Sequence, residues 1–409
     1  MNNNWLKMLI FILLIGFGVL ATFYVAGGYT IGLRALVGLR RLTGRALDPI
    51  SWARPDDSAL PGITIAIPAF NEGALIADRI SNLLETDYPL DKVEIYIVSD
   101  GSKDDTGDHV RAMQSAHPQV AISLEEFTQN QGKNGVQNHI TNAALHDVIV
   151  FTDSETRFEP ETLRALVAPL ADPQIGVCGG QIEYADITKG SSSSKLYQTY
   201  RKLEDTTRSL ETQLGIGCKV DGPCAAGRRG YWRVLHAHEA EDQVLPLMAR
   251  QAGLKTVHVA AAIAHDVANS RPKQELVQRR RMTRKALLSF KSSWSWTDAK
   301  TYPRFTAAYV SHKILRYFLP VFLILAAIGV LGLAAQAGLF WLGVALMVGS
   351  LLASMFSASQ PKYGRFLGMP YALFYSNLAL LLGIWDALLG RSIGTYVPTR
   401  TIGKPKAGA

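Results

Sequence analysis

The sequence predicts an α/β fold: a mostly parallel sheet with helices on both faces, plus transmembrane and interfacial helices. Short β-branched runs alternate with helical patterns between residues 61 and 270. Polar and acidic residues follow the ends of several of these runs. Long apolar segments lie on both sides of this region. The sequence therefore indicates an α/β domain that is attached to a membrane.

The first apolar segment is long enough to cross a bilayer. It is almost continuous from residue 9 to residue 25 and extends to Leu33, and about 20 apolar residues span a membrane. A signal peptide would have a shorter apolar region and a small-residue cleavage site. We therefore expect a transmembrane helix over residues 1–33, followed by a basic connector over residues 34–60.

The first half of the α/β region contains four predicted strands. They cover residues 63–67, 93–98, 120–124 and 148–151. Pro68 is expected to stop the first strand. Apolar residues at helical spacing predict helices over residues 72–85 and 138–145, and acidic residues around Thr106 mark another helix start. Strands that alternate with helices indicate a mostly parallel sheet.

Helices dominate the predicted second half of the chain. Helical patterns cover residues 195–214 and 237–253, and a basic amphipathic pattern covers residues 274–290. Apolar segments follow near residues 314–333, 339–355 and 371–389. The predicted divisions are residues 61–270 for the α/β domain, 271–300 for interfacial helices, 301–390 for transmembrane segments and 391–409 for a basic tail.

The charge distribution favours a membrane partner over nucleic acid. The formal net charge is +8, and basic residues such as Arg40 and Arg41 lie beside the apolar segments, as cytoplasmic flanks do. No zinc-finger, RRM-like or helix-turn-helix signature is visible. Three spans after the domain would place the basic tail on the other side of the membrane from the domain, whereas its positive charges favour the same side. Either one segment is interfacial or re-entrant, or a further span lies elsewhere.

The three cysteines predict buried thiols rather than a metal site or a disulfide framework. Cys178, Cys218 and Cys224 have no zinc-site spacing, and their odd number suits no set of paired bridges. They are compatible with a reducing compartment.

Candidate ligand-binding residues follow the predicted strands. Asn71 and Glu72 follow the first, Asp100 the second, and Asp153 and Glu155 the fourth. Strand ends of an α/β sheet face the crevice where ligands bind. Each group could by itself be a turn or a helix start. The pair of carboxylates after the fourth strand is the strongest signal, because it suits Mg²⁺ or Mn²⁺ bound together with phosphate oxygens.

Further candidates lie outside the strand ends, each with a structural alternative. Lys133, predicted in a flexible loop, is either a point charge for a diphosphate or a solvated lysine. Glu241 and Asp242 are either helix-dipole partners or a general base for an acceptor hydroxyl. Gln278 and Arg281 would bind an acceptor or a diphosphate, or form part of a basic helix on a membrane surface.

In their order, these motifs resemble those of the membrane-embedded family 2 glycosyltransferases. That group includes cellulose, hyaluronan, chitin-oligosaccharide and poly-N-acetylglucosamine synthases. The resemblance covers about residues 63–285. It rests on Asn71-Glu72, Asp100-Gly101-Ser102, Lys133 with Asn138, Asp153-x-Glu155, Glu241-Asp242 and Gln278-x-x-Arg281-Met282. It implies a GT-A-like fold.

The resemblance also implies a role for each motif. Asp153 and Glu155 would hold Mg²⁺ or Mn²⁺, and Asp242, next to Glu241, would be the catalytic base. The donor-binding residues would be Asn71, Glu72, Asp100, Lys133 and Asp153, with Asp100 at the uridine. The acceptor and diphosphate residues would be Gly222, Pro223, Cys224, Gln278, Arg281 and Met282.

Two residues depart from the family pattern. Glu155 replaces the usual second aspartate and adds a methylene, which alters the geometry available to a metal. Met282 replaces a tryptophan, which removes an aromatic platform and argues against long-chain processivity.

We expect an inverting, metal-dependent hexosyltransferase at the cytoplasmic face of the inner membrane. It would transfer a sugar from a UDP-linked donor to a glycan hydroxyl, in polysaccharide synthesis coupled to export. One alternative is transfer of a single sugar to a lipid-linked or short glycan acceptor. Another is a catalytically silent membrane scaffold that binds a nucleotide-sugar.

Overall fold

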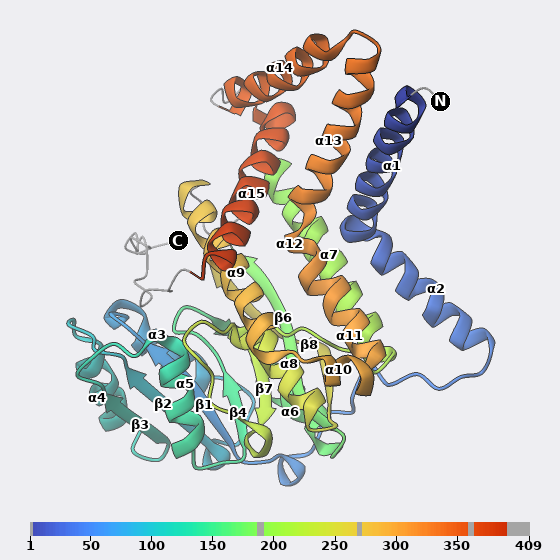
Figure 1. Cartoon of the computed structure of the whole chain (residues 1–409). Helices are drawn as coiled ribbons and strands as arrows, with labels where there is room; N and C mark the ends of the chain where they lie inside the picture. The colour runs from blue at the N-terminus through green and yellow to red at the C-terminus, as the bar shows by residue number, and fades with distance from the viewer. Residues whose placement is uncertain (1–2, 186–191, 268–271, 359–363, 391–409) are drawn as a thin grey trace.

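The computed structural model describes residues 3–185, 192–267, 272–358 and 364–390. A mixed eight-stranded sheet forms the centre of the α/β domain, and long apolar helices rise from one side of it (Figure 1). The strand order is β3-β2-β1-β4-β7-β6-β8-β5. The strands are β1 (Ile63–Ala69), β2 (Val93–Ser99), β3 (Ala121–Glu126), β4 (Val148–Phe151), β5 (Arg157–Phe158), β6 (Ile175–Ala185), β7 (Ala225–Arg228) and β8 (Lys255–Val267).

Helices cover the sheet and connect it to the apolar segments. Around the sheet lie α3 (Gly73–Leu84), α4 (Thr106–Ala116), α5 (Gly132–Ala143), α6 (Thr162–Val167), α7 (Ser192–Gln213) and α8 (Glu241–Gln251). After the sheet come α9 (Pro272–Ser293), α10 (Trp296–Thr301), α11 (Pro303–Tyr309), the π-helical turn η7 (Val310–Ile314) and α12 (Leu315–Tyr317).

The sheet has a parallel half and a mixed half. β1 pairs in parallel with both β2 and β4, and β2 pairs in parallel with β3. The short strand β7 runs antiparallel to β4 and to β6. β6 and β8 are parallel, and β5 is antiparallel to β8. The mixed α/β class is confirmed, and its regular parallel part is the half that contains the predicted strands.

The central strands are buried on both faces, which explains their nearly continuous apolar sequences. Ile63, Ile65 and Ile67 belong to one core together with residues of α3 and α4. Ala66 points to the other face, where it joins a second core with residues of α5 and α8. This alternation follows the two-residue period of a strand and gives the expected helices on both faces.

Two predicted boundaries were wrong. β1 continues through Pro68 to Ala69, with Pro68 opposite Val98 in the parallel register. α5 begins at Gly132 instead of residue 138, so Lys133 lies in a helix and not in a flexible loop. The early start depends on a contact from Asp100, which is distant in the sequence.

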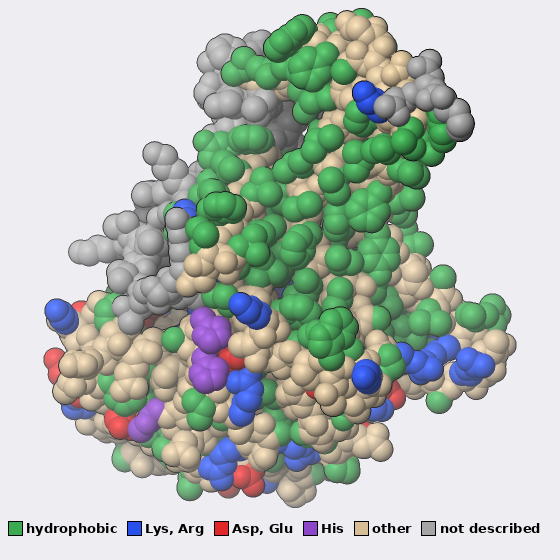
Figure 2. Space-filling model, in the orientation of Figure 1, with side chains coloured by type: hydrophobic (Ala, Val, Ile, Leu, Met, Phe, Trp, Pro, Cys, Tyr) green, Lys and Arg blue, Asp and Glu red, His purple; other side chains and the backbone are tan. Residues whose placement is uncertain are grey.

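Apolar helices form the half of the molecule that lies away from the sheet. They are α1 (Asn3–Phe23), which continues through the π-helical turn η1 (Tyr24–Gly28) into α2 (Tyr29–Leu42), and α13 (Leu319–Gln336), α14 (Phe340–Ala358) and α15 (Gly364–Leu388). In the described residues, the helical stretches Asn4–Leu42 and Leu319–Gln336 are long and apolar enough to span a membrane. Hydrophobic side chains cover most of the visible surface here (Figure 2).

Glycines bring α1 and α13 into close contact. A Cβ added to Gly18 would lie 2.5 Å from the carbonyl oxygen of Phe322, and one added to Gly329 would lie 2.6 Å from that of Phe11. Small residues let helix backbones approach in this way within membranes.

α14 has a different orientation from its neighbours. It runs across the far ends of α13 and α15, whereas α15 returns toward the sheet (Figure 1). The C-terminal part of α15 reaches α9, because Asp386 forms an ion pair with Arg280.

Candidate active site

Asp100 organises the start of α5. Its carboxylate is buried, and its two oxygens accept the backbone N–H groups of Gln131 at 2.7 Å and Gly132 at 2.8 Å. The first N–H groups of a helix have no partner within the helix. Gly132, with a φ of +78°, allows the sharp approach to the first turn. The carboxylate thereby fixes Lys133 in the second position of α5.

Asn71 and Glu72 form a second loop at the same edge of the sheet. Asn71 has a φ of +55°, a left-handed conformation that asparagine tolerates better than most residues. Its backbone N–H donates to Ser102 at 3.0 Å, and its side-chain oxygen accepts the N–H of Lys103 at 2.8 Å. The N–H of Glu72 donates to Thr106 at 2.9 Å. The loops after β1 and β2 therefore support each other.

Lys133, Asp153 and Glu241 form a group of charges that we call the donor-side cluster. The Lys133 Nζ lies 2.7 Å from Asp153 Oδ1 and 2.8 Å from Glu241 Oε1. The three side chains keep 27%, 29% and 13% of their surface exposed, in that order. Asp153, predicted at a strand end, and Glu241, predicted at a helix start, thus both contact the ammonium group of Lys133.

Electrostatics keeps this cluster ionised. Burial alone would raise the pKa of Glu241, but Lys133 and Lys285 outweigh burial and lower it to about 2. Burial likewise opposes the charge of Lys133, yet Asp153 and Glu241 together raise its pKa above the usual value. A cation between two carboxylates stabilises both negative charges.

The segment after β4 suits a hard divalent cation. Asp153 and Glu155 offer carboxylate oxygens, which Mg²⁺ and Mn²⁺ prefer. Between them, the Ser154 hydroxyl is buried and has no hydrogen-bond partner in the described part of the chain. Oxygen atoms alone make up this donor set, so its chemistry fits the expected metal.

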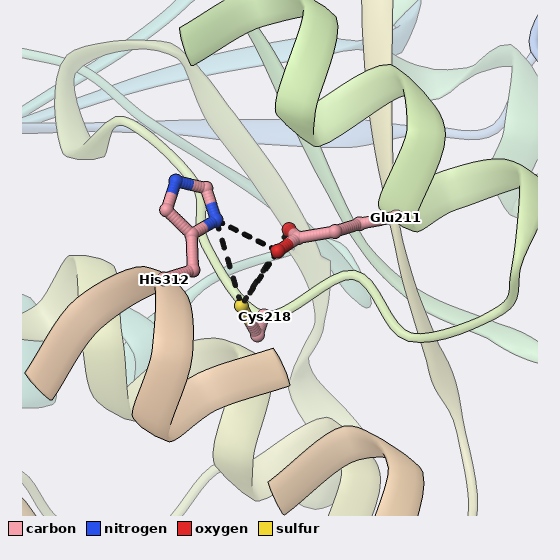
Figure 3. A group of neighbouring side chains, drawn as sticks. All are labelled: Glu211, Cys218 and His312. Atoms are coloured by element: carbon pink, nitrogen blue, oxygen red, sulfur yellow. Dashed lines mark hydrogen bonds and ion pairs between the residues drawn. The ribbon is translucent and has the colours of Figure 1, made fainter. Parts of the chain in front are cut away.

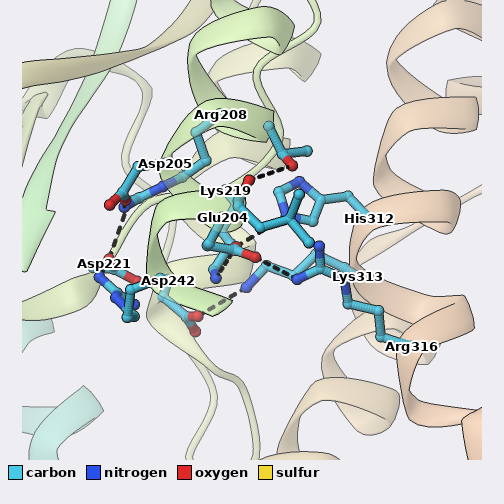
Figure 4. A network of polar contacts seen from close by, with 12 residues as sticks. Glu204, Asp205, Arg208, Lys219, Asp221, Asp242, His312, Lys313 and Arg316 are labelled. Atoms are coloured by element: carbon cyan, nitrogen blue, oxygen red, sulfur yellow. Dashed lines mark hydrogen bonds and ion pairs between the residues drawn. The ribbon is translucent and has the colours of Figure 1, made fainter. Parts of the chain in front are cut away.

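Asp242 faces a different partner from Glu241. Lys313, in η7, donates to Asp242 Oδ2 at 2.9 Å (Figure 4). Only 6% of the Lys313 side chain is exposed, compared with 28% for Asp242. The sequence analysis did not identify Lys313, because it lies 71 residues from Asp242 at the edge of an apolar region.

The loop predicted to line an acceptor site lies partly beside the donor-side cluster and partly in the core of the sheet. A Cβ on Gly222 would lie 3.1 Å from Glu241 Oε1, so the loop backbone adjoins the donor-side cluster. Cys224 is fully buried within the core of the sheet, so its thiol does not face the cluster. Cys178 and Cys218 are also free and buried, as expected.

α9 carries a cation that the sequence analysis missed. Lys285 lies near Glu241; burial first, then Arg281 and Lys133, lower its pKa. Lys285 follows Gln278 and Arg281 at helical spacing, which is the signal that would have found it. The start of α8 is attached to α9, because the N–H of Ala240 donates to Ser289 at 2.7 Å. Met282 is half exposed.

A second set of charges lies between α7 and η7, and we call it the buried network. It contains Glu204, Glu211, Lys219, His312, Lys313 and Arg316 (Figure 4). The Glu204 carboxylate has no exposed surface and pairs with Lys219, His312 and Arg316. The ring nitrogens of His312 lie 2.9 Å from Glu204 and 2.8 Å from Glu211.

Comparisons with known proteins concern the family and the fold of the chain. Residues 64–235 match the family described as Glycosyl transferase family 2. The N-acetylglucosaminyltransferase of Rhizobium meliloti (strain 1021) is 25% identical over 272 residues, 63% of either chain. That of Rhizobium sp. (strain N33) is 24% identical over 363 residues, 85% of this chain and 79% of the relative. The chain thus spans less than two thirds of the first of these relatives.

A solved structure shares the fold over nearly the whole chain. The mannosyltransferase PcManGT from Pyrobaculum calidifontis, in complex with GDP-Man and Mn²⁺, superposes with a TM-score of 0.69 at 21% identity. The match covers 94% of this chain and 100% of the other. Residues 64–235 thus match the glycosyltransferase family 2 model, and the chain shares the mixed α/β, GT-A-like fold of this structure.

Proposed function

We propose that this chain transfers N-acetylglucosamine from its UDP-linked form to a glycan hydroxyl, with inversion at the anomeric carbon. The observation that carries the proposal is the donor-side cluster. Lys133 joins Asp153, at the end of β4, to Glu241, at the start of α8, and Asp242 is the next residue. The choice of sugar follows the names of the curated relatives.

In this proposal, Asp242 is the general base. Its carboxylate takes the proton of the acceptor hydroxyl while that oxygen attacks the anomeric carbon. The bond between the anomeric carbon and the diphosphate breaks, and the nucleoside diphosphate leaves. Glu241 is the poorer candidate, because its pKa is lowered to about 2. Its role is to hold Lys133, at 2.8 Å.

Cations near the cluster stabilise the negative charge of the leaving diphosphate. Lys133 and Lys285 both lie close to Glu241, and Arg281 lies close to Lys285. Positioned positive charges stabilise an anion that develops during a reaction. Asp153 and Glu155 would hold Mg²⁺ or Mn²⁺, which supplies further neutralisation of the diphosphate when bound. Asn71, Glu72 and Asp100 would shape the nucleotide pocket.

We further propose that the enzyme is embedded in the inner membrane with its α/β domain in the cytoplasm. The apolar surfaces of α1 and α13 support this placement. Arg40 and Arg41 lie in the last turn of α2, on the same side as the sheet, which agrees with the positive-inside rule. In this orientation α14 would lie near the opposite membrane surface.

The product is proposed to be a polysaccharide passed through the apolar helices. Transfer of a single sugar to a lipid-linked or short glycan is the second candidate, and Met282 favours it. This side chain is 50% exposed on α9 and offers a sugar no aromatic platform.

A donor panel tests the proposal. The purified full-length chain, in detergent with Mn²⁺ or Mg²⁺, is incubated with UDP-N-acetylglucosamine, UDP-glucose and GDP-mannose, and release of nucleoside diphosphate is measured. We expect fastest release from UDP-N-acetylglucosamine and none after chelation of the metal. Binding of these donors without release would favour the silent scaffold instead.

Product size separates the two transfer reactions. A limited pulse of radiolabelled donor is followed by sizing of the glycan. Long chains from few initiations would support polymer synthesis, whereas only singly extended acceptors would support single transfer.

A further inference from the structure

The segment that leads into α13 contributes a charge to the start of α8. This segment is η7, a π-helical turn between α11 and α12. A π-helical turn holds more residues than an α-helical turn and often lies at functional sites. Here His312, Lys313 and Ile314 are all buried, although they are consecutive. The turn therefore directs two polar side chains into the protein from a largely apolar part of the chain.

Lys313 is held on the side of Asp242. Burial opposes its charge, yet the nearby Asp242 carboxylate raises its pKa. The other ionisable groups around the pair are Glu204 on α7, Cys218 after α7, Tyr309 on α11, Tyr317 on α12 and Lys285 on α9. Of these, Glu204 carries a negative charge and Lys285 a positive charge. Lys313 is in direct contact with Asp242, because its ammonium group donates to the carboxylate at 2.9 Å.

His312 anchors the same turn. Its two ring nitrogens contact Glu204 and Glu211, and Tyr29 of α2 donates to Glu211 at 2.9 Å. The Cys218 thiol is 3.5 Å from both oxygens of Glu211 (Figure 3). The ring of His312 thus bridges two fully buried carboxylates. The group is therefore a hydrogen-bonded anchor for η7.

We propose that Lys313 is a positioning residue for sugar transfer: its ammonium group holds the Asp242 carboxylate in one orientation. This inference rests on the proposed function, because it takes Asp242 as the base. The physical reason is that a hydrogen bond of 2.9 Å from a buried ammonium group restricts the rotation of the carboxylate. The helical segment entering α13 thus completes an active site that the α/β domain alone does not contain.

Kinetics of full-length variants tests this role. The substitutions are Lys313→Gln, which removes the charge, and Lys313→Arg, which keeps it. Turnover of the fastest donor of the panel is measured with Mn²⁺ between about pH 5 and pH 9. In Lys313→Gln, we expect kcat to fall on the order of 10²-fold, as for a misplaced catalytic group, with little change in the KM for the donor.

Lys219 provides the matched control. It is another lysine of the buried network, and it pairs with Glu204 instead of Asp242. Lys219→Gln should lower the thermal stability while the kcat of the folded enzyme stays near the wild-type value. An equal fall of kcat in Lys219→Gln, or an unchanged kcat in Lys313→Gln, would overturn the role of Lys313.

The arginine variant keeps the inference testable if Lys313→Gln does not fold. Arginine retains the charge, but its longer planar group should hold the Asp242 carboxylate in a different position and lower kcat several-fold. A wild-type kcat in Lys313→Arg would contradict a positioning role. If the wild-type enzyme releases no nucleotide from any donor, the proposed function itself fails; if it does and the variants match it, only the role of Lys313 fails.

Discussion

The donor-side cluster and the buried network meet at adjacent residues of α8, Glu241 and Asp242, but they differ in how exposed their carboxylates are. Glu241 belongs to the first, together with Lys133 and Asp153, and each of these side chains keeps part of its surface exposed. Asp242 connects to the second through Lys313. There the carboxylates of Glu204 and Glu211 have no exposed surface.

This difference in exposure separates ion pairs that can open for a ligand from ion pairs that stabilise the fold. A partly exposed ion pair can open to admit a ligand at modest cost. A fully buried one cannot lose a partner without leaving an uncompensated charge, which is strongly destabilising. We therefore expect changes in the donor-side cluster to affect ligands and pH dependence, and changes in the buried network to affect folding. Asp242, at the boundary, should affect catalysis.

Asp242→Asn should give the largest effect. The variant keeps the size of the side chain but loses the basic oxygen, so turnover should fall by roughly 10²–10⁴-fold. Nucleotide release gives the rate, and calorimetry with the donor serves as the control, because binding should persist. Wild-type turnover would remove Asp242 from the role of base.

Glu204→Gln should cause the largest loss of stability. It leaves Lys219, His312 and Arg316 without their shared carboxylate, and breaking a buried ion pair typically costs about 3–5 kcal/mol. Denaturant unfolding of the full chain measures the change. Glu159→Gln is the matched control: Glu159 pairs with His265 at a partly exposed site, so the loss there should stay below about 1 kcal/mol. Equal losses would refute the distinction between the two regions.

Lys133→Met should change the pH dependence of stability. The pKa of Glu241 is lowered from 4.5 to about 2. A lowered pKa stabilises the fold above the unfolded-state value, and this contribution disappears as the pH falls through the folded-state value. The wild type should therefore exceed Lys133→Met in stability at neutral pH, and their difference should shrink between about pH 4.5 and pH 2. Thermal unfolding across this range measures it; a constant difference would argue against the ion pair.

Glu155→Asp should have the smallest effect. It restores the usual shorter carboxylate of the family pattern while keeping the charge. The Mn²⁺ concentration for half-maximal turnover should change by less than about tenfold, since ligand charge and type are retained. A metal titration of activity measures this change. A complete loss of activity would mean that the longer side chain of Glu155 is essential in this protein.

The sequence predicted the parallel half of the sheet well because its signals are local. β1, β2, β3 and β4 each lie within a few residues of the predicted ranges, since short apolar runs bounded by turn residues carry their own information. The same holds for α9, whereas the first apolar helix continues through α2 to Leu42, into the predicted connector. Asp153, predicted to follow a strand end, does follow β4, and it lies in the donor-side cluster. The start of α5 was missed, because its cap is the carboxylate of Asp100, about thirty residues away.

By itself, the sequence determined the α/β class, the strand-end carboxylates and the apolar segments, because periodicity and composition act over a few residues. Only the tertiary structure decided the partners of those charges. It directed Glu241 to Lys133 and Asp242 to Lys313, and it brought Arg316 to Glu204 across 112 positions of the chain. Ion pairs depend on distances in space, and no local pattern specifies which distant lysine will reach a carboxylate.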